Sequence, residues 1–419
     1  AIRFARRWRN TSMKSNSMSR SRIQLLAAAT LTVLIGYLLK IPCAADSWSI
    51  SHSNLINLCY SDIGALYYWR GLIDGVIPYV QMGGENYVEY PVLIGILMWL
   101  ASIVTHWIQG NSPDVSVFVF LTWLSSGIFI VAAVNVMSRI KSRNRNAAWW
   151  FALSPAVLFT LGINWDAIAV LFMVLALYAW QEQKLVLTGI AVGLGTAAKL
   201  FPALILVVLA IAVWNSRDFK KVVIVGLSSA ASWLLVNVPF MILNFEGWFH
   251  FYDFSRKRGI DFGSPYLAIA YSGFFDHAWT STEVANAISS TVMIVSVLAM
   301  WFFRERLNVH SMLFILVAVF CLTNKVYSPQ YWLWLSPLVI LVTRSMRVWI
   351  AWNVAQTIYF VAVWRFILGT DLSFTGTGAI DERTYALSIL IMWLATAALV
   401  IKEFRSKDPQ LPAHDQSHL

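Results

Sequence analysis

The residues best suited to chemistry gather in one stretch, 60–91, of an otherwise strongly apolar chain. Tyr60 and Asp62 stand near its start, and Glu89 stands near its end. A carboxylate close to a membrane boundary is a functional candidate by default, and it can act as a general base. The sequence predicts a catalytic or ligand-binding role for Asp62; the alternative is that Asp62 only caps the helix that follows.

Two further carboxylates occupy positions where helices begin. Glu89 precedes Tyr90-Pro91 at the start of an apolar run, and Asp166 follows Asn164-Trp165 at the boundary of another. Negative charge and proline both favour the first turn of a helix, so capping explains much of this pattern. Because carboxylates also accept hydrogen bonds from sugar hydroxyls, we expect Glu89, Asp166 and the phenol of Tyr60 to contact a sugar or an acceptor.

Several cations have surroundings typical of an anion site. Lys199 lies in the apolar stretch 195–202, where Pro202 must interrupt the helix. A broken helix beside a buried cation is a recurrent way to hold an anion, although the lysine could instead extend to the membrane surface. Arg256, Lys257 and Arg258 form a second basic cluster, in a predicted outer loop. We expect these four residues to bind a phosphate.

A polar and aromatic segment, 325–332, lies between two apolar runs. Sugars present hydroxyls to polar groups and C–H faces to aromatic rings, so this mixture suits a sugar. We expect Lys325 to join the phosphate site, and Tyr327, Gln330 and Tyr331 to contact the sugar or the acceptor.

The elements that must position these residues are membrane helices. Of 419 residues, 58% are hydrophobic and 12% are charged, which leaves too little polar surface for a water-soluble globule. Apolar runs of about 17–25 residues predict an all-α polytopic membrane protein of about twelve transmembrane helices. The predicted spans are 23–39, 115–137, 147–162, 167–180, a broken pair over 185–214, 222–243, 284–303, 309–322, 331–342, 348–368 and 385–401.

The run 91–108 is long enough to cross the membrane, but the positive-inside rule argues against a crossing. If it does not cross, the basic clusters at 139–145 and 217–221 share the side of the basic N-terminus. We therefore expect a membrane-skimming helix there and one large non-cytoplasmic loop over 41–114, with an interfacial helix after Asp62. The predicted organisation is a basic cytoplasmic N-terminus (1–22) with an uncleaved anchor, one transmembrane catalytic domain (23–402) and a polar cytoplasmic tail (403–419).

Composition and motifs exclude several other functions. The net charge of +10 lies in short runs between spans, where it sets orientation and meets anionic lipid, so nucleic acid is not an expected partner. No nucleotide-binding or metal-ligating motif is present, and neither a metal nor a cofactor is expected. Cys43 and Cys59 share one predicted aqueous side, and spacing alone leaves their pairing open.

In these motifs the chain resembles the glycosyltransferase-C superfamily, and it is most similar to the family 87 mannosyltransferases of actinobacteria. The likeness rests on 60–63, on Pro78-Tyr79 and Glu89-Tyr90-Pro91, and on 196–202 and 325–331. It implies a plasma-membrane enzyme that takes a sugar from a polyprenyl-phosphate carrier on the non-cytoplasmic face, with Asp62 as general base and Lys199 near the carrier phosphate. Many members of the superfamily carry a second acidic residue where this chain has Gly64, which favours a metal-independent reaction.

The expected reaction is transfer of mannose to a glycolipid or cell-envelope glycan with inversion at the anomeric carbon. An arabinofuranosyltransferase with a pentose donor would use the same residues. A lipid-linked sugar transporter or flippase would use the same cations, but transporters usually have matched broken helices in two halves, and this chain has one clear break.

Overall fold

The computed structural model describes residues 2–48, 51–81, 83–110, 112–272, 281–370 and 376–406, with side chains from residue 20 onward except that of residue 85. The side chains of the basic N-terminal segment and nearly all of the predicted tail 403–419 therefore lie outside the described residues. Within the described ranges, helix is the only regular secondary structure. This confirms the predicted all-α class.

The helices are α1 (Ile2–Lys40), α2 (His52–Ile56), α3 (Asp62–Trp69), α4 (Val92–Gln109), α5 (Val115–Met137), α6 (Ala147–Ala152), α7 (Pro155–Thr160), α8 (Ala167–Gln181), α9 (Leu185–Ala198), α10 (Leu204–Ala212), α11 (Phe219–Leu243), α12 (Phe245–Lys257), α13 (Pro265–Ser272), α14 (Thr282–Phe302), α15 (Val309–Thr323), α16 (Tyr331–Val342), α17 (Met346–Thr370) and α18 (Glu382–Arg405). Short 3-10 turns are η1 (Ile41–Asp46), η2 (Leu72–Asp74), η3 (Gly84–Asn86) and η4 (Phe201–Ala203).

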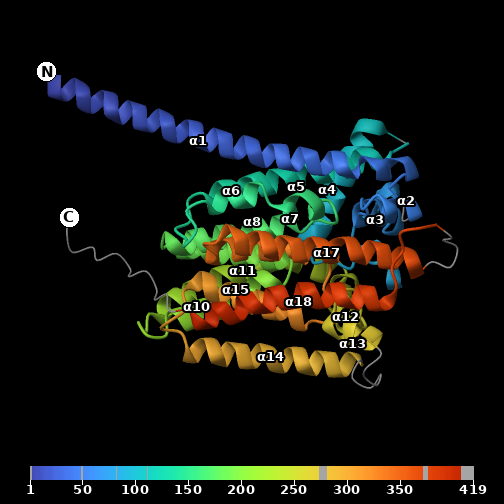
Figure 1. Cartoon of the computed structure of the whole chain (residues 1–419). Helices are drawn as coiled ribbons and strands as arrows, with labels where there is room; N and C mark the ends of the chain where they lie inside the picture. The colour runs from blue at the N-terminus through green and yellow to red at the C-terminus, as the bar shows by residue number, and fades with distance from the viewer. Residues whose placement is uncertain are drawn as a thin grey trace.

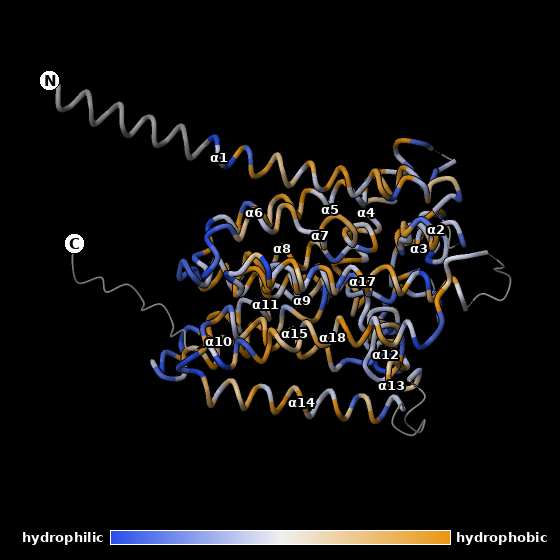
Figure 2. The backbone as a smooth tube through the Cα atoms, in the orientation of Figure 1, coloured by the Kyte–Doolittle hydropathy of each residue, from blue (hydrophilic) through white to orange (hydrophobic). Residues whose placement is uncertain are grey.

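The long helices form a bundle whose elements run side by side, with α1 along one edge and α14 along the opposite edge (Figure 1). α2, α3, α12 and α13 gather at one end of this bundle. We call it the site end, and the opposite end, where α1 enters the bundle and α18 finishes, the basic end. Figure 2 shows apolar residues along the helices and polar residues concentrated towards their ends and connections. This distribution matches helices that cross a membrane.

Helices α1 and α5 are antiparallel neighbours. Near the basic end, Arg22 Nε donates to Asn135 Oδ1 at 2.8 Å. Towards the site end, the rings of Tyr37 and Phe120 lie 5.8 Å apart, edge to face. The segment between them, 41–114, therefore leaves and returns at the site end, as predicted for one large outer loop.

Helix α4 belongs to that loop, so it starts and finishes at the site end. Its last turns are tied to η2, because Ser102 Oγ donates to the carbonyl of Leu72 at 2.6 Å and a ring nitrogen of His106 lies 2.9 Å from the carbonyl oxygen of Ile73. This agrees with the predicted helix that skims the membrane, although α4 is also long and apolar enough for a span.

Among the described residues, seven helices are long and apolar enough to cross a membrane, namely α1 from Arg20 on, α4, α5, α11, α14, α17 and α18. The other predicted spans correspond to shorter apolar helices, some of them broken, as in α6–α7 and α9–η4–α10. The structure thus confirms a polytopic helical protein. It does not confirm twelve separate full-length spans.

Basic loops from distant parts of the sequence meet at the basic end. Arg143 Nη1 pairs with Glu403 Oε2 at 2.8 Å, and Arg304 Nε donates to Asn215 Oδ1 at 2.7 Å. The first contact joins the loop after α5 to the last turn of α18, and the second joins the turn after α14 to the turn after α10. The predicted grouping of the basic loops on one side is therefore confirmed as a spatial arrangement.

Small residues allow α9 to approach α11 closely. A Cβ atom on Gly189 would lie 1.9 Å from Ser228 Oγ, and one on Gly193 would lie 2.0 Å from Ser232 Oγ. Glycine at such positions lets two membrane helices pack backbone to backbone. This packing fixes the direction in which α9 leads into Lys199, the residue that follows it, at the site end.

Candidate functional site

Asp62 is the first residue of α3, and its side chain is free for chemistry because another residue caps the helix. Ser61 Oγ accepts a hydrogen bond from the backbone N–H of Ile63 at 3.2 Å, so Ser61 is the N-cap. The backbone N–H of Asp62 donates to the carbonyl of Ile163 at 2.8 Å. The alternative that Asp62 serves only as a cap is therefore wrong.

Two tyrosines hold the Asp62 carboxylate from opposite sides. Tyr60 Oη donates to Oδ1 and Tyr90 Oη donates to Oδ2, each at 2.9 Å. The Asp62 side chain is partly exposed, and each carboxylate oxygen can accept more than one hydrogen bond. An acceptor hydroxyl can therefore reach this carboxylate without displacing either tyrosine. Tyr90 was not among the predicted site residues.

Burial raises the pKa of Asp62 above the ordinary aspartate range, while the hydrogen bonds from Tyr60 and Tyr90 oppose that rise. The negative charge of Glu89 adds to the rise. For both phenols, burial followed by the charge of Asp62 raises the pKa well above the usual value for tyrosine. The phenols therefore stay protonated and remain donors. A general base is most effective when its pKa lies near the working pH, so the shift of Asp62 is in the useful direction.

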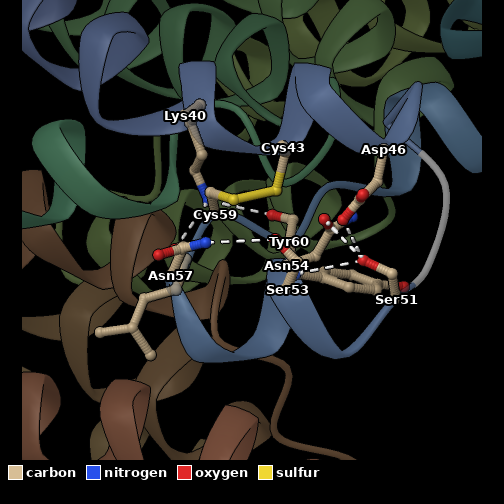
Figure 3. The surroundings of a disulfide bond; sticks show 10 residues. Lys40, Cys43, Asp46, Ser51, Ser53, Asn54, Asn57, Cys59 and Tyr60 are labelled. Atoms are coloured by element: carbon tan, nitrogen blue, oxygen red, sulfur yellow. Dashed lines mark hydrogen bonds between the residues drawn. A yellow bond between two sulfur atoms is a disulfide. The ribbon is translucent and has the colours of Figure 1, made fainter.

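A disulfide and a lysine fix the chain that leads into this centre. Cys43 and Cys59 are joined, with Cα atoms 5.9 Å apart, which settles the pairing that spacing left open. Lys40 reaches from the end of α1 past this disulfide towards the backbone ahead of Asp62 (Figure 3). Its Nζ donates to the carbonyls of Tyr60 at 2.9 Å and Leu58 at 3.4 Å.

Tyr79 fixes the backbone of the segment that carries Tyr90. Its hydroxyl lies 2.9 Å from the carbonyl oxygen of Tyr90 and 3.0 Å from that of Pro91. Gly95 leaves the space for this ring, since a Cβ atom there would lie 2.3 Å from the Tyr79 hydroxyl. Tyr79 is fully buried and therefore supports the site without touching a substrate.

The second carboxylate, Asp166, is completely buried and paired. Its Oδ1 lies 3.1 Å from Lys199 Nζ, and its Oδ2 accepts a hydrogen bond from Trp334 Nε1 at 2.8 Å. It makes no side-chain cap, although it stands at the start of α8. With 0% of the side chain exposed, Asp166 orients Lys199. The predicted contact of Asp166 with sugar or acceptor stays a prediction.

Tyr90 links the two centres. While its hydroxyl donates to Asp62, its ring lies beneath the Lys199 ammonium, with Nζ 4.4 Å from the ring centroid. Such a contact stabilises a cation by the negative face of the ring. The Lys199 side chain is 14% exposed, so its nitrogen can also meet a ligand.

Glu89 lies near this centre but is paired. Its Oε2 accepts from Arg70 Nε at 2.7 Å, and both side chains are mostly buried. Tyr60 stacks on Trp364, with ring centroids 4.6 Å apart. The predicted sugar contacts of Tyr60 and Glu89 stay predictions; Arg70 adds a cation that was not among the predicted site residues.

Within the predicted 256–258 cluster, Arg258 acts electrostatically on Tyr60. Arg256 and Lys257 both pair with Asp253, and their side chains are 74% and 68% exposed. Arg258 pairs with Asp261, and its charge lowers the pKa of Tyr60, although burial raises that pKa overall. The three cations therefore do not converge on one point.

The Lys325 ammonium is engaged with the backbone. Its Nζ donates to the carbonyl of Arg256 at 2.9 Å. Burial and the nearby charge of Arg258 lower the pKa of Lys325. Lys325 thus holds the loop that carries Arg258, and a phosphate role for Lys325 stays a prediction.

The predicted sugar-binding residues of the segment 325–332 also differ from one another in exposure and partners. Tyr327 is 1% exposed and donates its hydroxyl to Gln356 Oε1 at 2.9 Å, and its predicted sugar contact stays a prediction. Gln330 is buried and accepts from Ser328 Oγ at 2.6 Å. Tyr331 is partly exposed and stacks on Trp334 with ring centroids 4.0 Å apart, so it adjoins the Asp166 centre.

The predicted interfacial helix after Asp62 is shorter and more buried than expected. It ends at Trp69, and Gly71, with a φ of 62°, turns the chain away. Ile63, Leu66 and Leu72 are at most 4% exposed. Because α3 packs against α5, much of its apolar face meets protein, whereas Trp69 at its end is 55% exposed. No cluster of three or more His, Cys, Asp or Glu side chains suited to a metal occurs in the described part of the chain.

Comparison with known proteins gives one family. The model of glycosyltransferase family 87 matches residues 87–323. This range includes Tyr90, Asp166 and Lys199, and it excludes Asp62 and Lys325. No curated protein matches the chain. Since the match covers more than half of the sequence, the chain belongs to glycosyltransferase family 87.

Proposed function

We propose that this membrane glycosyltransferase moves a mannosyl group from a polyprenyl-phosphate carrier to a hydroxyl of a glycolipid or cell-envelope glycan. The observation that carries the proposal is that a carboxylate and an ammonium group lie on either side of one tyrosine. Asp62 offers a partly exposed carboxylate, and Lys199 offers an oriented ammonium, with Tyr90 in contact with both. Transfer from a lipid phosphosugar needs a proton acceptor and a group that stabilises the departing phosphate.

Asp62 acts as the general base in this mechanism. Its carboxylate takes the proton of the acceptor hydroxyl while the hydroxyl oxygen forms a bond to the anomeric carbon. The bond from that carbon to the phosphate oxygen breaks, and the polyprenyl phosphate leaves with the bonding electrons. Attack from the face opposite the leaving group inverts the anomeric centre, by analogy with inverting glycoside hydrolysis.

Lys199 and Arg258 stabilise the leaving phosphate. Because Asp166 balances the charge of Lys199 at 3.1 Å, the lysine contributes directed N–H donors more than uncompensated charge. Lys325 keeps the Arg258 loop in place through its bond to the carbonyl of Arg256. The phosphate therefore meets donors from two segments, 199 and 258, that are far apart in the sequence.

Two observations support a non-cytoplasmic active site in the plasma membrane. The disulfide between Cys43 and Cys59 lies at the site end, and disulfides persist in oxidising compartments. Arginine and lysine from several loops gather at the opposite end, as the positive-inside rule expects of a cytoplasmic side. The termini would then be cytoplasmic.

The test is transfer of radiolabel from polyprenyl-phosphate mannose to a membrane glycolipid extract by the purified protein, with and without EDTA. We expect a labelled product in both conditions, because the proposed mechanism needs no metal. Loss of product with EDTA would contradict metal independence but would leave the donor proposal standing.

The donor is tested separately. Product from a polyprenyl-phosphate pentose and none from the mannose donor would replace mannosyl transfer by arabinofuranosyl transfer. Movement of the lipid-linked sugar across vesicles without any transfer would overturn the proposed reaction in favour of a transporter.

A further inference from the structure

A basic groove lies at the basic end of the bundle, between α1 and the connection from α5 to α6. Its volume is about 1010 Å³. The residues that line it include three cations and no acidic side chain. Its polar and aromatic lining includes Arg22, Asn135, Lys141, Asn144, Arg145 and Trp149. Such a surface attracts an anion, and it is separate from the Asp62 centre at the other end.

One wall of the basic groove is a fixed guanidinium. Arg22 Nε and Nη2 both donate to Asn135 Oδ1, at 2.8 and 2.5 Å. This pair ties α1 to α5 and sets the direction of the arginine. A guanidinium has five N–H donors, so the bond to Asn135 leaves donors for a phosphate.

Another part of the lining is the α5–α6 loop, which is held by one hydrogen bond to α8 and one within the loop. The backbone N–H of Lys141 donates to Gln181 Oε1 at 2.6 Å, and Ser142 Oγ donates to the carbonyl of Asn144 at 2.9 Å. The side chains of Lys141 and Arg145 are exposed. The backbone is therefore ordered, and the two cationic side chains remain accessible from outside.

The apolar part of the basic groove shows which kind of anion fits. Leu25, Leu26 and Met137 belong to its lining. Further along α1, which runs along one edge of the bundle (Figure 1), Leu31 is 58% exposed and Leu34 is 54% exposed. A charged rim that continues into a lipid-facing apolar surface suits a molecule with a phosphate and acyl chains, whereas free phosphate would use only the rim.

We propose that the basic groove binds the phosphate headgroup of an anionic phospholipid. Arg22 contacts the phosphate, Lys141 and Arg145 close around it from the α5–α6 loop, and the acyl chains follow the exposed apolar face of α1. The site ties α1 to the rest of the bundle through a lipid. It does not depend on the reaction that Asp62 performs.

The experiment is native mass spectrometry of the full chain in detergent, titrated with phosphatidylglycerol and, separately, with phosphatidylcholine. We expect tighter binding of phosphatidylglycerol. The variant Lys141→Gln/Arg145→Gln should lose roughly 30-fold in affinity for it, since each cation near a membrane surface contributes about a factor of five. The matched control, Lys220→Gln/Arg347→Gln, removes two exposed charges outside the groove lining and should bind like the parent.

Three results would overturn the proposal: equal affinity for the two lipids, an unchanged affinity in the Lys141→Gln/Arg145→Gln variant, or an equal loss in the control. Displacement of phosphatidylglycerol by millimolar inorganic phosphate would make this a site for free phosphate and would also overturn it. If the double variant aggregates, the single variants decide the question, with a roughly fivefold loss expected for each.

Discussion

Asp62 and Asp166 are the same chemical group in adjoining centres, yet their surroundings give them opposite uses. Asp62 is partly exposed and accepts hydrogen bonds from two neutral phenols. Asp166 is fully buried and meets a cation and an indole N–H. A carboxylate without a cationic partner can gain a proton from a substrate. One that neutralises a lysine is better suited to holding that lysine in place.

Among the substitutions proposed here, we expect the largest loss of transfer from a change at Asp62. Asp62→Asn keeps the size of the side chain and removes the base, so we expect transfer to fall by about 10²–10⁴-fold. Binding of the polyprenyl-phosphate donor should change little. Rates of radiolabel transfer and donor affinity measured on the same preparation check both statements. Asp74→Asn, in the same outer loop and exposed, is the matched control. Normal transfer by Asp62→Asn would refute the proposed base.

Asp166→Asn should act through Lys199. The lysine would lose its ion partner in a mostly buried place, at a cost of about 3–5 kcal/mol in the free energy of unfolding. We expect a lower temperature of thermal unfolding and a weaker donor affinity. The double variant Asp166→Asn/Lys199→Gln should recover much of the stability, because no unpaired charge remains, but not the activity. Recovery of both would show that Lys199 does not contact the donor.

Substitution of Tyr60 or Tyr90 should shift the pH dependence of transfer. Its effect on the rate at neutral pH should be smaller than that of either carboxylate substitution. A base works only when ionised, so transfer should decline as the pH falls through the raised pKa of Asp62. Tyr60→Phe or Tyr90→Phe removes a hydrogen bond that lowers this pKa, so the decline should begin at higher pH. Profiles of kcat/KM against pH measure the shift, and Tyr68→Phe, outside the carboxylate's hydrogen bonds, should leave it unchanged. A shift to lower pH would contradict the assigned donors.

Much of the architecture could be predicted from the sequence because membrane helices are encoded locally. Continuous apolar runs predict the helices, and the distribution of basic residues predicts which loops share a side. In the structure Asp62, Asp166 and Lys199 lie at one end of the bundle, where Tyr90 contacts both Asp62 and Lys199. The bond from Asp62 N–H to the carbonyl of Ile163 confirms that arrangement.

Such local patterns do not predict contacts between segments that are far apart in the sequence. Spacing assigned Asp166 to a helix cap or a sugar contact, whereas its partners, Lys199 and Trp334, come from other helices. The same limit applies to Arg256 and Lys257, which pair with their local partner Asp253. Charge type alone does not distinguish a cation that faces a ligand from one that is already paired.

The sequence by itself determined the class of protein, which basic loops gather at one end of the bundle and the segments that carry the candidate chemistry, because hydrophobic length and charge act locally along each helix. Only the tertiary structure decided that Tyr90 joins the two carboxylate centres, that Cys43 pairs with Cys59 and that α3 packs against α5. These features depend on distances between atoms of separate segments, and close packing sets such distances for the whole bundle at once.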